Sequence, residues 1–155
     1  MKTHIVVHHS ATADSSTLSN VGAIRDYHVN VNKWRDVGYH FLLDRMSGRV
    51  ETVIGRLPDE EGAHTLELGL NRLGFGICCV GNYDVVTPPE DLMAALRRLC
   101  LYLMRTYQIP PENVLGHREA QAAGGVPVAG RKSCPGRLFD MDAFRASLRA
   151  PTSPL

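Results

Sequence analysis

Short apolar runs alternate with longer amphipathic stretches along the chain, a pattern typical of an α/β protein. The run at 5–7 is apolar without interruption, which indicates a strand buried on both faces of a sheet. Further strands are predicted at 38–44, 50–54, 75–80 and from 114 onward. Ser47 and Gly48 suit a tight turn and predict a hairpin around them. The sequence therefore predicts a mixed central sheet of about five strands flanked by helices.

Three stretches repeat their apolar residues at helical spacing. These apolar positions are 21 and 24 with His28 in the first, 92 to 103 in the second, and 141, 144 and 148 in the third. The second helix is expected to end near Tyr107, and Pro151 is expected to stop the third. Thr87 and Glu90 have the spacing of a capping box ahead of the second helix. A polar loop is predicted at 10–19.

Length and composition limit the possible classes of protein. The 155 residues suit one domain, which we expect at 1–150 with a disordered tail at 151–155. The formal net charge of +1 provides no large positive field for nucleic acid. No apolar stretch approaches the roughly 20 residues of a membrane-spanning helix, and the first residues do not resemble a signal peptide. We expect a monomer, made in the cytoplasm, that neither binds nucleic acid nor inserts into a membrane.

Three residues have the composition of a catalytic zinc site. His8 and His117 each follow a short apolar run, and Cys134 lies in the polar segment 132–136. Two imidazoles and a thiolate suit zinc, and three protein ligands leave a fourth position for water. Neighbouring strand residues point to opposite faces, so His9 is expected to pack away from His8. Spacing alone does not prove that the three candidates meet.

Five short motifs identify a possible family. They are 8–12, 37–41, 62–64, 116–119 and 132–136, and they occur in this order. The series resembles the zinc-dependent N-acetylmuramoyl-L-alanine amidases of type 2, which include amidase-type phage lysozymes and peptidoglycan recognition proteins. The resemblance covers about 4–149, nearly the whole chain. It implies the peptidoglycan-recognition, amidase type 2 fold.

The resemblance also implies roles for single residues. It assigns one Zn²⁺ per chain to His8, His117 and Cys134. It places Tyr39 beside the zinc-bound water and makes Lys132 the catalytic lysine. The chemistry agrees, because attack on an amide carbonyl builds an oxyanion that needs a positive or hydrogen-bonding partner. From the residues alone, Tyr39 could instead be a packed strand aromatic and Lys132 a solvated loop residue.

Three further candidate residues have two interpretations each. His64 and Asn71 correspond to substrate-cleft positions in the family, but loop residues of these types are often only solvated. Glu119 is either a partner that fixes the tautomer of a metal ligand or a surface carboxylate paired with Arg118. The Ala-, Gly- and Val-rich segment between 119 and 132 resembles an insertion in one wall of the cleft.

The resemblance implies a peptidoglycan hydrolase that cleaves the bond between N-acetylmuramic acid and L-alanine. Without a secretion signal, it would be an endolysin made in the bacterial host and released to the cell wall by a holin-type protein. One alternative is a non-catalytic peptidoglycan-binding module, although binding-only relatives typically lack the cysteine found here at Cys134. Another is a cytosolic muropeptide-recycling amidase, against which both Cys134 and Tyr39 argue.

Overall fold

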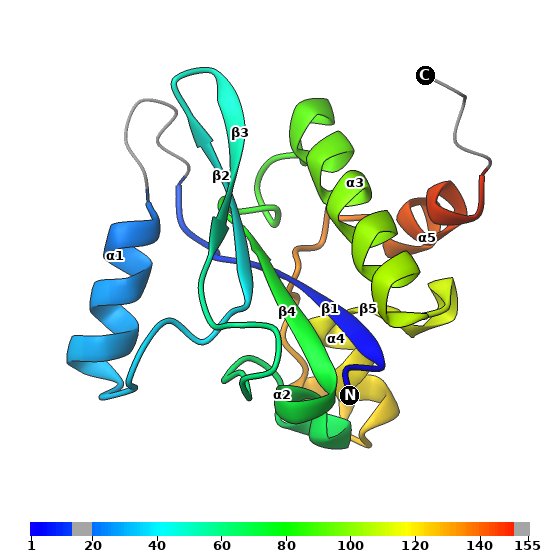
Figure 1. Ribbon diagram of the computed structural model, residues 1–155, viewed down its shortest axis with the longest axis horizontal. Helices are drawn as coiled ribbons and strands as arrows, with labels where there is room; N and C mark the ends of the chain where they lie inside the picture. Colours follow the sequence, from blue (N-terminus) through cyan, green and yellow to red (C-terminus); the bar gives the residue numbers. More distant parts are fainter. Residues whose placement is uncertain (14–19, 151–155) are drawn as a thin grey trace.

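A five-stranded sheet forms the centre of the protein, which a computed structural model describes over residues 1–13 and 20–150 (Figure 1). The strands are β1 (His4–His9), β2 (Phe41–Met46), β3 (Arg49–Ile54), β4 (Gly74–Cys79) and β5 (Val114–Gly116). Their order across the sheet is β3-β2-β4-β1-β5. β2 and β3 pair in antiparallel fashion, and the other neighbouring pairs are parallel. The predicted mixed sheet is confirmed, as is the hairpin, in which Ser47 and Gly48 both have positive φ.

Two helices, α3 (Glu90–Tyr107) and α5 (Met141–Arg149), cover one face of the sheet (Figure 1). Ile5 and Val7 of β1 point into this core because alternate strand residues share a face. The buried leucines of α3 at positions 92, 96 and 103 meet them. The Asp140 side chain caps α5 by accepting from the Ala143 N–H at 2.9 Å. The amphipathic spacing predicted both helices because one stripe of each faces this core.

The other face of the sheet is covered by two separate groups of residues. On one side Val21, at the start of α1 (Val21–Asp26), packs against buried residues of β2 and β4. On the other side Val6 of β1 packs against Leu70 of α2 (Leu70–Leu73) and Ala120 of α4 (His117–Ala123). The next β1 residue on this face is His8, which lies at the carboxyl end of the strand. Ligands of parallel sheets commonly bind at this end.

β2 is shorter than the prediction, and the difference matters for Tyr39. The strand begins at Phe41 rather than at residue 38. Gly55 and Arg56 donate their backbone N–H groups to the carbonyls of His40 and Tyr39, at 2.9 and 3.0 Å, so the hairpin continues as a bend. A Cβ on Gly55 would lie 2.3 Å from the Tyr39 carbonyl oxygen, so glycine permits this close approach. The bend directs the Tyr39 ring towards His8, with centroids 5.2 Å apart.

Several helix predictions need correction. The first helix is α-helical to Asp26 and continues as a π-helical turn, Tyr27–Val31, that contains the buried His28. The predicted capping box is wrong, because Pro89 occupies the N-cap and Glu90 is already the first helical residue. α2 and α4 were not predicted, and α4 lies at the start of the segment interpreted as an insertion. The predicted tail, 151–155, and part of the 10–19 loop lie outside the described residues.

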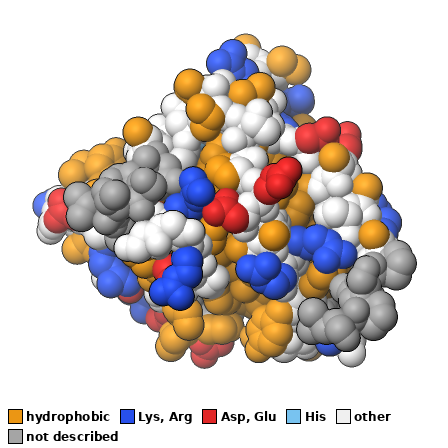
Figure 2. All heavy atoms as spheres, turned by 90° about the horizontal axis from the view of Figure 1, so that it is seen from above, with side chains coloured by type: hydrophobic (Ala, Val, Ile, Leu, Met, Phe, Trp, Pro, Cys, Tyr) orange, Lys and Arg blue, Asp and Glu red, His pale blue; other side chains and the backbone are white. Residues whose placement is uncertain are grey.

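Three properties considered from the composition can be compared with the structure: membrane-spanning helices, the state of the cysteines and surface charge. Over residues 1–13 and 20–150, no helix combines the length and apolar character needed to cross a bilayer. The cysteines are free thiols, and Cys78, Cys79 and Cys100 are fully buried, as expected. On the face seen in Figure 2, basic and acidic side chains are scattered among hydrophobic ones, so this face carries no continuous basic surface.

Candidate metal centre and cleft

The parallel pairing of β1 with β5 brings two of the predicted ligands together. Val7 pairs with Gly116, so the residues that follow, His8 and His117, leave adjacent strands at the same edge. Their ring centroids are 4.7 Å apart. The Cys134 Sγ lies 3.6 Å from His8 Nδ1. One nitrogen of each histidine and the sulfur lie within 4.8 Å of one another, so the three predicted ligands converge.

Arg118 holds the cysteine loop in place. Its backbone N–H donates to the Cys134 carbonyl at 2.8 Å. Its guanidinium donates to the carbonyls of Ser133, Gly136 and Phe139 at 3.1, 2.6 and 2.6 Å. Arg118 follows His117 directly, so a single turn of α4 positions both His117 and the loop that carries Cys134.

Both interpretations of Glu119 were wrong. Its carboxylate accepts from the Gly116 N–H at 2.7 Å, at the start of α4. It also accepts from the Arg145 guanidinium through both oxygens at 2.7 Å, which ties α4 to α5. Glu119 therefore neither contacts a metal ligand nor pairs with Arg118. His9 packs on the opposite face from His8, as expected, and its Nδ1 accepts from the Tyr83 N–H at 3.2 Å.

Burial favours the neutral form of all three groups. Burial lowers the pKa of His8 well below its usual value, and nearby His64 and His117 lower it further. Burial also lowers the pKa of His117. Both imidazoles are therefore neutral near pH 7, the form in which histidine binds metal. Burial raises the pKa of Cys134 to about 11, opposed by the His9 backbone N–H and Lys132.

The loop that contains His64 and Thr65 contacts the second ring nitrogen of His8. Its Nε2 lies 3.1 Å from His64 Nδ1 and 3.3 Å from Thr65 Oγ1. Asn71 holds this loop, because its Oδ1 accepts from the backbone N–H groups of His64 and Thr65 at 2.6 and 2.7 Å. Burial lowers the pKa of His64 to about 3. The structure thus places His64 beside His8, a predicted metal ligand, and Asn71 behind the loop; both residues also line the second cavity described below.

Tyr39 and Lys132 lie on the cleft side of the three ligands. The Tyr39 ring contacts His8, and its centroid lies 5.7 Å from that of His28. Tyr39 is therefore not simply a strand aromatic packed beside Phe41. Burial raises the pKa of Tyr39 well above its usual value, so the phenol keeps its proton. Lys132 is exposed, and its backbone N–H donates to Gln121 Oε1 at 2.8 Å.

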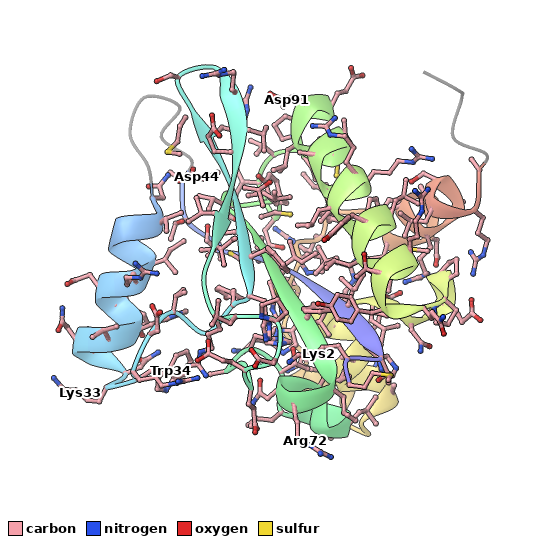
Figure 3. All side chains as sticks on the ribbon, in the orientation of Figure 1. Lys2, Lys33, Trp34, Asp44, Arg72 and Asp91 are labelled. Atoms are coloured by element: carbon pink, nitrogen blue, oxygen red, sulfur yellow. The ribbon has the colours of Figure 1, made fainter. Side chains whose placement is uncertain are left out.

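Three cavities join to form the cleft. The central one, about 700 Å³, contains the three converging ligands together with Tyr39 and Lys132. The second, about 520 Å³, shares His64 and Trp34 with it and continues past Asn71. The third, about 390 Å³, shares Tyr39 and lies against α1. Figure 3 labels Trp34 on the segment between α1 and β2. The second and third cavities therefore extend the central cavity beyond the three predicted metal ligands.

Sequence reasoning missed several residues around the cleft. The Trp34 ring packs against His28 at a tilt of 51°, with centroids 4.7 Å apart, and His28 Nδ1 accepts from the Gly38 N–H at 3.0 Å. Glu67 Oε2 lies 3.9 Å from His117 Nε2. A π-helical turn beside a cleft is a feature often found at functional sites, but it is visible only in the structure. Glu67 lies outside every motif, so no local signal identified it.

Comparison with known proteins gives consistent results. A family model described as N-acetylmuramoyl-L-alanine amidase (Amidase_2) matches residues 2–137. A human N-acetylmuramoyl-L-alanine amidase is 32% identical over 146 residues, which are 88% of this chain but 23% of that protein. The endolysin of Klebsiella phage KP32 is 39% identical over 108 residues, 66% of this chain and 67% of the endolysin. The structure of the amidase LysC from Clostridium intestinale superposes with a TM-score of 0.75 at 26% identity, covering 97% of this chain and 87% of LysC.

Proposed function

Because the chain belongs to the N-acetylmuramoyl-L-alanine amidase family Amidase_2, we propose that it hydrolyses the amide bond between N-acetylmuramic acid and L-alanine in peptidoglycan. The observation that carries this proposal is the convergence of His8, His117 and Cys134 within 4.8 Å in the central cavity of the cleft. Two neutral imidazoles and a thiol are a donor set that fits Zn²⁺, and we propose one ion per chain.

The residues around the proposed ion divide the work of hydrolysis. When bound, zinc lowers the pKa of a coordinated water towards about 7. Lys132 lines the same cavity as the ligands, where an ammonium can stabilise the oxyanion that develops on the carbonyl. Tyr39 keeps its proton and lies against His8, so its hydroxyl can orient the water or donate to the tetrahedral intermediate. His64 and Asn71 line the neighbouring cavity, where we place the rest of the substrate.

The similarity to a phage endolysin supports a role in lysis of the cell wall. We propose synthesis in the bacterial host cytoplasm, release by a holin-type protein, and action as a monomer on the wall. Two other functions in the same family are a non-catalytic peptidoglycan-binding module and a muropeptide-recycling amidase. The presence of Cys134 among the converging residues favours the enzyme over the binding module. Tyr39 beside the ligands, where the resemblance implies a glutamate in recycling amidases, favours the wall hydrolase.

The test is the chemistry of the products from purified sacculi. Amide hydrolysis releases L-alanine amino termini and creates no reducing sugar ends, whereas glycoside hydrolysis does the opposite. We expect amino groups to rise with time while the reducing-sugar assay stays flat. Binding to sacculi with neither product would identify a binding module. New reducing ends without amino groups would exclude the proposed reaction.

A further inference from the structure

Glu67 presents a buried carboxylate to one of the metal-site histidines. Its Oε2 lies 3.9 Å from His117 Nε2, and the two side chains are 19% and 10% exposed. This oxygen is buried and has no hydrogen-bond partner among residues 1–13 and 20–150. The same part of the chain shows no salt bridge from Glu67 to a lysine or arginine. The carboxylate is therefore directed at the imidazole without a competing partner.

The backbone directly after Glu67 adopts an unfavourable conformation at Leu68. Leu68 and Gly69 follow it, both in the left-handed region, with φ of 56° and 68°. The Leu68 side chain is 50% exposed, so burying it does not explain the unfavourable conformation. Strain of this kind tends to collect at functional sites.

Gly124 makes room for Glu67 at the end of α4. A Cβ on Gly124 would lie 2.7 Å from the Glu67 Cβ and 3.0 Å from its Cγ. The φ of Gly124 is −80°, which any residue adopts, so the glycine is needed for space rather than for conformation. The helix that begins with His117 thus also fixes the path of the Glu67 side chain.

The chemistry of imidazole gives this contact a use. With Nε2 facing Glu67, Nδ1 is the nitrogen left to face the other ligands, as His8 Nδ1 faces Cys134. A carboxylate that accepts from the second nitrogen fixes the tautomer and orientation of a metal-binding histidine. Within residues 1–13 and 20–150, the side chains that contact His8 Nε2 are the neutral His64 and Thr65, whereas His117 Nε2 faces the acidic Glu67.

We propose that Glu67 is the positioning residue of His117: it accepts a hydrogen bond from Nε2–H and holds Nδ1 towards the metal. The two atoms are 3.9 Å apart, so the bond forms only if they approach by about 0.7–1.2 Å. Its negative charge also offsets that of a divalent cation bound to two neutral imidazoles and one thiolate. The inference rests on the proposed zinc site and adds a residue that none of the sequence motifs contains.

The experiment compares zinc binding by wild type, Glu67→Ala and Glu67→Gln, with Glu61→Gln as the matched control on an exposed carboxylate. Zinc affinity is measured by competition with a chromophoric chelator, and the His117 tautomer by ¹⁵N NMR of the metal-free and zinc-loaded proteins. We expect Glu67→Ala to bind zinc about 10- to 100-fold more weakly and to lose the preference for the Nε2–H tautomer. Glutamine keeps an acceptor but not the charge, so a smaller loss is expected. Glu61→Gln should match wild type.

The outcomes are separable. Zinc affinity of Glu67→Ala within about threefold of wild type, or an unchanged tautomer, would overturn the positioning role, because removing the partner of a metal-binding histidine typically weakens metal binding by about tenfold or more. If Glu67→Ala does not fold, Gly124→Ala decides, because it keeps the carboxylate and displaces it; unchanged zinc affinity there refutes the inference. If wild type itself binds no zinc, the proposed metal site fails and the role of Glu67 fails with it.

Discussion

Replacing Asn71 with alanine separates two roles, supporting the loop behind His8 and contacting substrate. The Asn71 Oδ1 accepts from the backbone N–H groups of His64 and Thr65 at 2.6 and 2.7 Å. Alanine leaves both donors without this partner. An unsatisfied buried donor costs about 1–3 kcal/mol. Both groups are only partly buried, so we use about 1–1.5 kcal/mol each and expect a total loss of about 2–3 kcal/mol.

Urea unfolding of the metal-free protein measures this loss of free energy, and thermal unfolding gives Tm, both followed by circular dichroism. In a protein of this size each kcal/mol lowers Tm by about 2–4 °C, so Tm should fall by about 4–12 °C. Asn71→Asp is the matched control, because a carboxylate oxygen accepts from both N–H groups and should preserve most of the stability. Since Thr65 and His64 contact His8 Nε2, zinc affinity should also fall in Asn71→Ala and be largely retained in Asn71→Asp.

The opposite pattern would refute this reasoning. If Asn71→Ala unfolds within about 0.5 kcal/mol of wild type yet loses affinity for muramyl peptides, the side chain acts on the ligand and the loop does not depend on it. If Asn71→Asp is as unstable as Asn71→Ala, the two hydrogen bonds are not the source of the stability.

Three further predictions concern the metal, the oxyanion and pH. Cys134→Ser should lose zinc, measured by metal analysis, along with activity; full activity would exclude the proposed ligand set. Lys132→Ala should lower kcat by about 10²–10³-fold with zinc content unchanged; loss of the metal instead would show that the lysine supports the site. Burial lowers the pKa of His40 to about 4, so the folded chain resists protonation there. The corresponding stability is present above pH about 6.5 and is lost as pH falls towards 4. Urea unfolding at pH 7 and 5 should show a loss about 2 kcal/mol larger in wild type than in His40→Asn; equal losses would contradict this.

The amino-acid sequence by itself was enough to predict the elements with a clear apolar pattern. The uninterrupted apolar run of β1 and the helical spacing of apolar residues in α3 identify these two elements, and α3 ends at Tyr107 as predicted. The order of the short motifs also pointed to His8, His117 and Cys134. Each motif is a run of consecutive residues, so it can be identified without knowing how the chain folds. The sequence therefore predicts which segments are buried and which residues could bind a metal.

The tertiary structure alone decided how these pieces meet. His8 and His117 become neighbours only through the register of β1 with β5, a contact between residues far apart in the chain. The bend that turns Tyr39 towards His8 depends on Gly55, which directly follows the opposite strand β3. Helices as short as α2 and α4 span too few turns to show a period. Glu67 lies in the short 3-10 turn Glu67–Gly69, and Glu119 pairs with Arg145 of α5, so both contacts depend on how distant segments pack. Such arrangements depend on packing and hydrogen bonds between residues far apart in the chain. These contacts produce no periodic pattern of apolar residues in the sequence.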